Sequence, residues 1–178
     1  MTRSVALLRA VNVGGRKLPM ADLRTLCERL GWSDVATYIQ SGNVVFTASG
    51  ASDALETKLE EAIAAGFGMD VPAMIRTAAQ WDALVASNPF PSVAEEEPNR
   101  LQLLVSKRPP GADAAEKIMA RAQAGETVRP AGGALWFHYP AGVGTSKLTP
   151  ALIDRAAGSH STSRNFRTIL KLQEMLAG

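Results

Sequence analysis

The chain has 178 residues, of which 46% are hydrophobic, and its 19 basic and 17 acidic side chains give a formal charge of +2 at pH 7. This length suits one ordinary domain or two small ones with a buried core, and the even charge balance does not favour nucleic acid as a partner. No apolar run approaches the roughly 20 residues that a membrane-spanning helix requires. The single cysteine, Cys27, excludes an intrachain disulfide framework and a thiolate metal cage. Because the N-terminus also lacks the apolar segment of a signal peptide, we expect a cytoplasmic protein.

The first half of the chain has the pattern strand, helix, strand, strand, helix, strand. Val5 opens a continuous apolar run that is typical of a central strand, and Pro19 suits the first turn of a helix with leucines at helical spacing. Ser41-Gly42 joins two alternating segments as a hairpin. The predicted elements are a strand over 5–10, a helix over 19–31, strands over 35–40 and 43–47, a helix over 53–66 with an Asp53–Glu56 capping box and its end at Gly66, and a strand over 71–75.

The second half predicts a similar order. Thr77 and Gln80 form a capping signal for a helix that ends before Pro89, and the proline-rich, acidic stretch 88–98 predicts an irregular linker. A final strand is not predicted, because a helix takes its place in the pattern. The predicted elements are a strand over 101–105, a helix capped by Asp113 and Glu116, hairpin strands over 127–129 and 135–139, a helix from Thr149-Pro150 to Gly158, and a last helix over 166–176 behind hydroxyls at 161–163.

These patterns predict an α+β fold of two ferredoxin-like subdomains of the βαββαβ type, the second of which ends in helices. The predicted limits are an N-terminal subdomain with a linking helix over 1–88, a linker over 89–98, and a related C-terminal subdomain over 99–178. The sequence does not indicate how the two subdomains are oriented.

A candidate binding site lies in the loop 9–19, between the first strand and the first helix. Right-handed crossovers make the first two strands of a split βαβ unit parallel, so their carboxyl ends meet at one sheet edge and the loop lies beside the hairpin. Glycines let a ligand approach the backbone, and helix amides with Arg9 or Lys17 favour an anion. The residues expected to bind a small anionic or phosphate-bearing ligand are Arg9, Asn12, Gly14, Gly15, Lys17, Tyr38, Gln40, Ser41 and Asn43, with Ser146, Lys147, Arg164 and Asn165 closing the site from the second half.

The same residues of the first half also have a purely structural interpretation. Gly14-Gly15 satisfies a turn, Asn43 closes the hairpin, and Lys17 is a solvated surface charge. Both interpretations stay open at the level of the sequence.

In the second half, the glycine-rich segment 142–147 is not a Walker motif. The glycine required before Lys147 is missing, and Leu148 stands where a magnesium-binding hydroxyl belongs. The segment therefore forms either an anion-binding loop or a turn that caps a helix. Hydroxyls at 161–163 also suit helix capping, whereas Arg164 and Asn165 exceed what capping demands.

No catalytic centre or metal site can be assembled from the remaining residues. His138 and His160 stand apart from clustered cysteines or carboxylates, so no zinc site is expected. Cys27 lies on the apolar face of the first helix and is expected to be a core residue. Catalytic residues and cofactors are therefore unassigned, and an enzymatic reaction stays an open question.

Two other function classes compete with a ligand-binding pocket. The second interpretation is a nucleic-acid-binding module, in which Tyr38 and Trp136 stack on bases and basic loops contact phosphates. The third is an interaction scaffold without a ligand. A membrane partner is not expected, and the sequence does not indicate an oligomeric state.

Several sequence blocks carry a family resemblance across nearly the whole chain. The blocks are Leu8-Arg9-Ala10-Val11-Asn12-Val13-Gly14-Gly15, Lys17-Leu18-Pro19-Met20, Tyr38-Ile39-Gln40-Ser41-Gly42-Asn43-Val44-Val45-Phe46, Ser146-Lys147-Leu148 and Ser163-Arg164-Asn165. Through them the chain resembles the uncharacterised, mainly bacterial family called domain of unknown function 1697, with Ala10 and Phe166 as mild departures where glycine and tryptophan are usual. The resemblance implies a cytoplasmic α+β protein of two related subdomains and supplies no catalytic residues.

Overall fold

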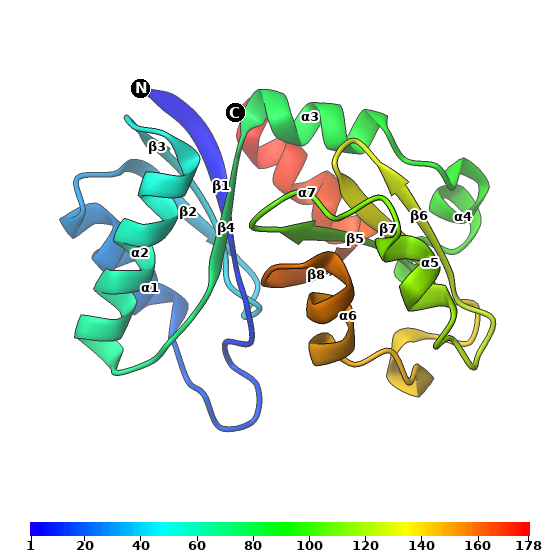
Figure 1. Cartoon of the computed structure of the whole chain (residues 1–178). Coiled ribbons are helices and arrows are strands. Elements are labelled where there is room, and N and C mark those ends of the chain that lie inside the picture. The colour runs from blue at the N-terminus through cyan, green and yellow to red at the C-terminus, as the bar shows by residue number, and fades with distance from the viewer. The chain divides into compact units, whose positions relative to one another are not determined.

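A computed structural model describes residues 1–178 and shows an α+β protein with two four-stranded antiparallel sheets and seven α-helices (Figure 1). The chain divides into two compact units, unit 1 with Met1–Trp81 and Leu172–Gly178, and unit 2 with Asp82–Lys171. The elements that begin before residue 82 are β1 (Thr2–Leu8), α1 (Met20–Arg29), β2 (Ser33–Tyr38), β3 (Asn43–Ala48), α2 (Ser52–Phe67), β4 (Ala73–Thr77) and α3 (Ala78–Ala86).

The remaining elements begin in unit 2. They are α4 (Pro91–Glu96), the 3-10 helix η1 (Pro98–Arg100), β5 (Leu101–Ser106), α5 (Ala114–Met119), β6 (Thr127–Ala131), β7 (Ala134–His138), the 3-10 helix η2 (Val143–Thr145), α6 (Pro150–Ala157), β8 (Ser161–Asn165) and α7 (Phe166–Ala177). The last residues of α7 belong to unit 1, in which Arg3 Nη2 donates to the Met175 carbonyl at 3.1 Å.

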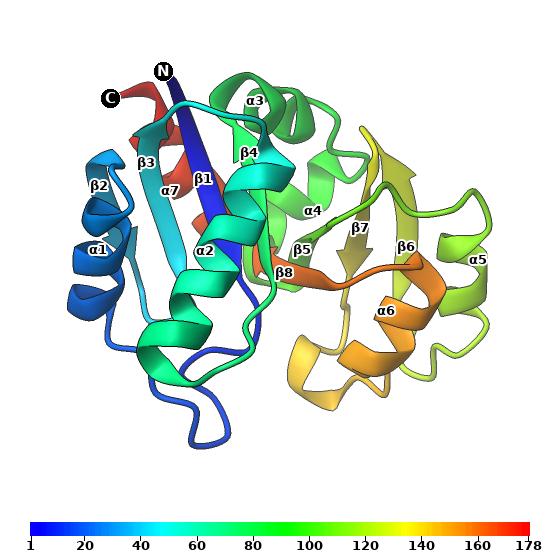
Figure 2. The ribbon, with the colours of Figure 1, turned by 60° about the vertical axis from the view of Figure 1, so that its left-hand side comes forward.

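The sheet of unit 1 has the strand order β2-β3-β1-β4. β1 is a central strand, and its residues from Ser4 to Leu8 are buried on both faces, as its apolar run predicts. Helices α1 and α2 lie on one face of this sheet (Figure 2). The core between these layers includes Ala6, Leu8, Leu23, Cys27, Val44, Phe46, Leu55, Leu59 and Ile63.

The strand registers bring the ends of β1 and β2 to the same edge of the sheet. Asn43, the first residue of β3, pairs with Leu7 of β1 on one side and with Tyr38 of β2 on the other. The loop that leaves β1 therefore starts beside the β2–β3 hairpin, as the predicted crossover geometry requires. The hairpin itself is confirmed.

The sheet of unit 2 has the strand order β6-β7-β5-β8, which repeats the order of unit 1 strand for strand. Its hairpin turns through Gly132 and Gly133, both at positive φ (61° and 78°), as a two-residue turn between antiparallel strands requires. Trp136 on β7 is fully buried. The core of this unit includes Leu104, Ala114, Ile118, Val128, Leu135, Phe137, Tyr139 and Ile153.

Several local predictions are wrong. Ser161–Asn165 forms the edge strand β8, which pairs antiparallel with β5, so the fourth strand is present and the hydroxyls at 161–163 belong to it. The stretch 88–98 contains the helix α4, because Pro91 occupies its first position, where no amide hydrogen is needed. Helix α2 continues through Gly66 and ends at Phe67, and its C-cap residue, Gly68, adopts the left-handed conformation with φ 64°.

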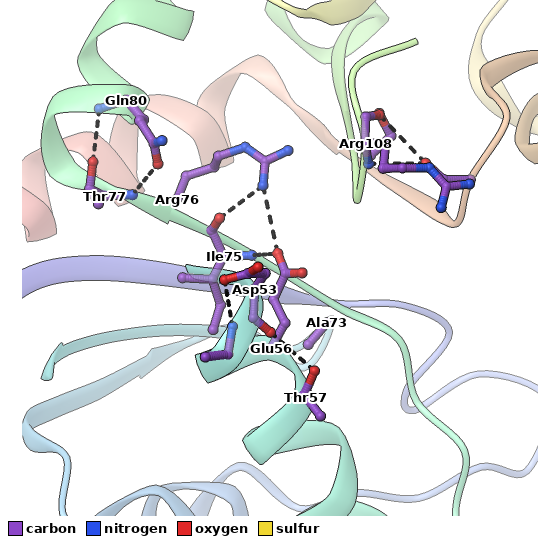
Figure 3. Close-up of polar contacts among 12 residues, drawn as sticks. Asp53, Glu56, Thr57, Ala73, Ile75, Arg76, Thr77, Gln80 and Arg108 are labelled. Carbon is purple, nitrogen blue, oxygen red and sulfur yellow. Dashed lines mark hydrogen bonds and ion pairs between the residues drawn. The ribbon is translucent and has the colours of Figure 1, made fainter. Parts of the chain in front are cut away.

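Carboxylates on α2 accept hydrogen bonds from β4, an edge strand of the sheet in unit 1 (Figure 3). β4 is an edge strand, and Glu56 Oε1 accepts a hydrogen bond from the Ile75 amide at 2.8 Å, while Glu60 Oε1 accepts one from the Ala73 amide at 2.8 Å. Glu56 Oε1 also lies 3.7 Å from Nη1 of Arg76. The predicted capping box of Asp53 and Glu56 is therefore wrong, because the Glu56 carboxylate turns to the sheet and no side chain caps α2.

The second capping box, at Thr77 and Gln80, is confirmed (Figure 3). The Gln80 amide hydrogen bonds to Thr77 Oγ1 at 3.2 Å, and the Thr77 amide bonds to Gln80 Oε1 at 2.9 Å. Thr149 likewise caps α6 by accepting from the Leu152 amide at 3.2 Å. At α5 the predicted cap is wrong, because Asp113 caps no amide and pairs with Lys117 at 2.8 Å.

Candidate functional site

The loop 9–19 folds back on itself as a miniature hairpin. Val13 and Arg16 form an isolated antiparallel bridge around Gly14 and Gly15, whose φ angles are 56° and 81°. The Asn12 amide donates to the Arg16 carbonyl at 2.6 Å, and the Arg16 amide donates to the Val13 carbonyl at 3.0 Å. The glycine pair is required by this tight turn, because L-residues rarely adopt two consecutive positive φ angles.

The side chain of Asn12 joins this loop to the β2–β3 hairpin. Its Nδ2 donates to the Leu18 carbonyl at 2.9 Å and to the Gln40 carbonyl at 2.7 Å, and its Oδ1 accepts from the Leu18 amide at 2.9 Å. Both amide hydrogens and the amide oxygen are thus used within the fold. Asn12, predicted as a ligand-orienting residue, is a positioning residue of the loop.

The β2–β3 hairpin packs closely against the end of β1. Gly42 is buried at φ 85°, and a Cβ added there would lie 2.8 Å from Leu8 Cβ and 2.7 Å from Val11 Cγ2. The Leu8 amide donates to the Gly42 carbonyl at 2.8 Å. Asn43, which is fully buried, donates from Nδ2 to the Tyr38 carbonyl at 2.9 Å and to Ser41 Oγ at 3.0 Å. These contacts fix the hairpin relative to the loop.

A cavity of about 750 Å³ lies where the loop, the hairpin and the start of α1 meet. Helix α1 begins after Pro19 without a side chain capping its first amides, and the cavity reaches those residues. An uncapped helix N-terminus favours a negative charge, because its amide hydrogens point outward and the helix dipole is positive there. The lining residues are Asn12, Gly15, Arg16, Lys17, Pro19, Met20, Ala21, Arg24 and Gln40.

Three of these nine lining residues are cationic, and none is acidic. Lys17 is exposed and has neither a hydrogen bond nor an ion pair. Arg24 donates from Nη1 to Thr37 Oγ1 at 2.7 Å, and Arg16 donates from Nη2 to the Asp70 carbonyl at 2.6 Å. Neither arginine is paired with a carboxylate in these contacts, so both keep their charge for an anion in the cavity.

Arg24 is a residue that the sequence prediction missed, and Arg16 was not among the predicted ligand residues although it lies in the loop. A signal for Arg24 exists in the sequence, because it lies one helical turn after Met20 and Ala21, at the start of the helix that follows the loop. Such spacing places side chains on one helix face. The three cations therefore come from one short segment that includes the loop end and the first turns of α1.

Five predicted residues of unit 1 do not line this cavity, namely Arg9, Gly14, Tyr38, Ser41 and Asn43. The Arg9 amide donates to the Pro72 carbonyl at 3.0 Å, and partial burial lowers the pKa of its guanidinium. Tyr38 is half-buried at the end of β2. The structure thus places Gly15, Lys17, Gln40 and the amide of Asn12 together at the cavity, and the other predicted residues beside it in the framework.

The predicted residues of unit 2 have local structural partners of their own. Ser146 Oγ donates to Glu126 Oε1 at 2.7 Å and accepts from the Leu148 amide at 3.2 Å. Burial acts to raise the pKa of Glu126, but hydrogen bonds from Ser146 and backbone amides outweigh it and lower that pKa. Lys147 is exposed beside this anchored serine. Ser146 therefore holds the segment before α6 in place.

Arg164 and Asn165 lie at the end of β8. Arg164 is buried, donates from Nη1 to Thr162 Oγ1 at 2.8 Å and to the Ser163 carbonyl at 2.8 Å, and burial lowers its pKa to about 10. Asn165 Oδ1 accepts from the Thr168 amide at 3.0 Å and so caps α7. The capping role that we assigned to the hydroxyls at 161–163 belongs to Asn165.

Metal-binding and nucleophilic groups are sparse. The structure has no group of three or more His, Cys, Asp and Glu side chains that could hold a metal ion. Cys27 lies fully buried in the core of unit 1, where burial and the neighbouring charge of Glu28 raise its pKa to about 12. A thiol with this pKa is protonated at neutral pH and is a poor nucleophile. None of the helices is both long enough and apolar enough to span a membrane.

Comparisons with known proteins agree on a family without an assigned activity. The family model described as "Protein of unknown function (DUF1697)" matches residues 1–136, so the chain belongs to this family. The solved structure of a conserved bacterial protein, SP0830 from Streptococcus pneumoniae, is similar with a TM-score of 0.72 and 24% sequence identity over 98% of both chains. This likeness shows a shared fold. The comparison with curated proteins gives no significant match.

Proposed function

We propose that this member of the DUF1697 family binds a small anion, through its phosphate or carboxylate group, in the cavity at the start of α1. One observation carries the proposal: Arg16, Lys17 and Arg24 line the cavity, and no acidic residue lines it. A cavity with one sign of charge attracts ligands of the opposite sign and raises their local concentration.

The side chains at the cavity suit different parts of such a ligand. Lys17 supplies a mobile ammonium group that neutralises charge from any direction, whereas the planar guanidinium of Arg24 has donors left for two oxygens of one phosphate or carboxylate. The outward amides at the start of α1 add donors from the backbone. Gln40, which is exposed at the hairpin, recognises a polar group next to the anion.

Backbone strain in both flanking loops supports a site that is arranged before a ligand arrives. Ala10, Asn12 and Ile39 adopt positive φ angles of 54°, 55° and 49°, which are unfavourable for residues other than glycine. The hydrogen bonds from the Asn12 side chain to the Leu18 and Gln40 carbonyls stabilise the loop 9–19 and the β2–β3 hairpin in this shape. A cavity that is already formed loses less entropy when it binds a ligand.

The experiment is isothermal titration calorimetry of the intact chain with inorganic phosphate, followed by pyrophosphate and a panel of phosphorylated and carboxylated metabolites. Lys17→Ala and Arg24→Ala remove one cation each, and we expect each to raise the Kd of the best ligand about tenfold, since a charge-assisted hydrogen bond contributes about 1.5 kcal/mol. The matched control is Arg29→Ala, which removes the same charge from the last turn of the same helix, outside the cavity.

The control keeps the proposal falsifiable. If Arg24→Ala and Arg29→Ala raise the Kd equally, the effect comes from the net charge of the chain, and a site at the cavity is contradicted. Binding that is unchanged in both Lys17→Ala and Arg24→Ala would contradict it as well. A circular dichroism melt of each variant identifies any loss caused by unfolding.

We further infer that both units are variants of the ferredoxin-like fold. The support is the strand order β4-β1-β3-β2 in unit 1 and its counterpart β8-β5-β7-β6 in unit 2, each antiparallel throughout, with a helix after the first strand and another after the third. This architecture accepts many functions, so it supports the geometry of the proposed site and not a particular reaction.

A further inference from the structure

Unit 2 has a basic surface, which we call the basic face, on the side of α5 and α6. It consists of Lys107, Arg108, Lys117, Arg121, Arg155 and His160. These residues line two depressions of about 610 Å³ and about 570 Å³. Arg155 lines both depressions, so they adjoin at this residue. Figure 2 shows α5 and α6 side by side, and the two helices are in contact.

Two acidic side chains of this region, Asp154, which lines one of the depressions, and Asp113, are held by hydrogen bonds or an ion pair. Asp154 Oδ1 accepts from the Ser161 amide at 3.0 Å and from Ser161 Oγ at 2.7 Å, and its Oδ2 lies 3.3 Å from Nδ1 of His160. Asp113 pairs with Lys117 at 2.8 Å. The side chains of Arg121 and Arg155, by contrast, are exposed and have no hydrogen-bond or ion-pair partner. The face therefore has an excess of positive charge that the fold does not use.

The charge is also distributed unevenly between the two units. Unit 2 has eleven Lys and Arg against eight Asp and Glu, whereas unit 1 has eight against nine. Three of the acidic residues of unit 2 are Glu95, Glu96 and Glu97, on α4 or directly after it and outside the two depressions. The even charge balance of the whole chain is therefore an average over an acidic and a basic unit. It is no argument against a polyanionic partner for unit 2.

We propose that the basic face binds the sugar–phosphate backbone of a nucleic acid. Two adjoining depressions with cations around each suit a ligand with regularly repeated negative charges, and a single small anion would occupy only one of them. This site is independent of the proposed cavity in unit 1, because the two share no residue.

The chemistry of the lining indicates contacts to phosphates without recognition of bases. No aromatic residue lines either depression, and Trp136, which we expected to stack on bases, is fully buried in its sheet. Base stacking on the sheet is therefore excluded for Trp136. Binding through Lys and Arg alone depends strongly on salt and weakly on sequence, because released counterions dominate its free energy.

The experiment measures fluorescence anisotropy of a labelled single-stranded RNA and of a labelled RNA duplex, each titrated with the intact chain at several salt concentrations. For four phosphate contacts with a single strand, the logarithm of the binding constant should fall with the logarithm of salt at a slope of about −3. Arg121→Glu with Arg155→Glu should weaken binding at low salt at least tenfold and reduce the slope to about half. Arg167→Glu is the matched control, because it reverses the charge of another exposed arginine of unit 2 outside both depressions.

Several results would overturn the proposal. These are no binding of either RNA at about 50 mM salt, where the electrostatic attraction should be strong, or equal weakening by the double variant and by Arg167→Glu. Displacement of the RNA by poly-glutamate at equal charge concentration would assign the face to acidic polypeptides. Lys17→Ala should leave RNA binding unchanged, so failure of this proposal and failure of the anion site in unit 1 are distinguished. Thermal melts establish that the double variant is folded.

Discussion

The two units have the same order of strands but attach the loop after their first strand in different ways. In unit 1 the loop 9–19 is bound to its own hairpin through Asn12 and Gln40. In unit 2 the shorter loop 107–113 is bound to the turn between α6 and β8, where Arg108 Nη2 donates to the Gly158 carbonyl at 2.7 Å. The first arrangement forms a cavity at a helix start, and the second leaves depressions along helix sides. The same strand order thus carries two different surfaces, each of which we propose as a binding site.

Apart from the loops, the two units have the same kinds of stabilising contact at matching positions. The last strand of each unit, which lies at a sheet edge, receives hydrogen bonds from a carboxylate of the preceding helix, Glu56 for β4 and Asp154 for β8. Each of these strands also ends in a residue that caps the next helix, Thr77 for α3 and Asn165 for α7. The two units therefore share these contacts at matching positions and differ in their loops.

The largest expected difference between the units is in the stability that they lose when a hairpin glycine is replaced by alanine. In Gly42→Ala, the new Cβ would lie 2.8 Å from Leu8 Cβ at a φ of 85°, so steric overlap in the core adds to backbone strain. We expect the free energy of unfolding to fall by about 4 kcal/mol. In Gly132→Ala, the nearest atom is Ser87 Oγ at 2.7 Å, a side-chain oxygen that can rotate away, and we expect a loss of about 2 kcal/mol.

Urea unfolding followed by circular dichroism checks both values. Gly133→Ala serves as the control, because its φ of 78° carries backbone strain but its new Cβ would meet no atom within 4 Å. Its expected loss is about 1 kcal/mol. Equal losses for Gly42→Ala and Gly133→Ala would show that close packing of the hairpin on β1 contributes nothing.

The next largest effect tests whether Glu56, which bonds to β4, and Asp154, which bonds to β8, contribute equally to stability. Glu56→Ala leaves the Ile75 amide without its acceptor and Arg76 without a charge that lies 3.7 Å away, so we expect a loss of about 3 kcal/mol. Asp154→Ala removes the acceptor of the Ser161 amide and hydroxyl, and we expect about 2 kcal/mol.

Hydrogen exchange followed by mass spectrometry measures the same variants strand by strand. Faster exchange should be concentrated in β4 for Glu56→Ala and in β8 for Asp154→Ala. Glu61→Ala, which truncates an exposed carboxylate on the same helix as Glu56, should stay within about 0.5 kcal/mol of the wild type. A loss in Glu61→Ala as large as in Glu56→Ala would assign the effect to helix α2 and not to its bond with β4.

The sequence predicts most of this scaffold, because apolar periodicity reports which faces are buried. The run from Val5 and the helical spacing of Leu23 and Cys27 identify β1 and α1 correctly. β8 was not predicted, because its sequence has no apolar periodicity. Its residues Ser161–Asn165 are all polar, and this strand is held by its ladder with β5 and by Asp154, neither of which leaves an apolar pattern.

The candidate site was predictable in its position but not in the roles of its residues. Topology places the loop beside the hairpin, which the registers of Asn43 confirm. Whether an amide faces a ligand or the backbone depends on tertiary hydrogen bonds, so Asn12 was assigned to a ligand although the fold uses all its polar atoms. Glu56 was misjudged likewise, because a glutamate in a first turn serves either its own helix or a neighbouring strand.

The smallest expected effect is the dependence of stability on pH. Each unit has a buried weak acid whose neutral form is favoured by folding, the thiol of Cys27 in unit 1 and the phenol of Tyr139 in unit 2. In unit 1, burial raises the pKa of Cys27 from 9.0 to about 12, and in unit 2 burial and the charge of Glu126 raise the pKa of Tyr139 above its ordinary value of 10.0. A pKa raised by folding gives stability that is complete below the unfolded pKa and is lost as the pH rises. The loss therefore begins near pH 9 for Cys27 and near pH 10 for Tyr139.

Between pH 8 and pH 10, ionisation of Cys27 in the unfolded chain should lower the stability of unit 1 by about 1.4 kcal/mol, and ionisation of Tyr139 should lower that of unit 2 by only about 0.4 kcal/mol. Urea unfolding at several pH values measures the slope by fluorescence in chains that keep one tryptophan, the others being replaced by Phe, with Trp32 as the reporter of unit 1 and Trp136 as that of unit 2. Cys27→Ala should flatten only the first slope and Tyr139→Phe only the second. A slope at the Trp32 signal that Cys27→Ala leaves unchanged would mean that this thiol ionises as easily in the fold as in the unfolded chain, against its complete burial.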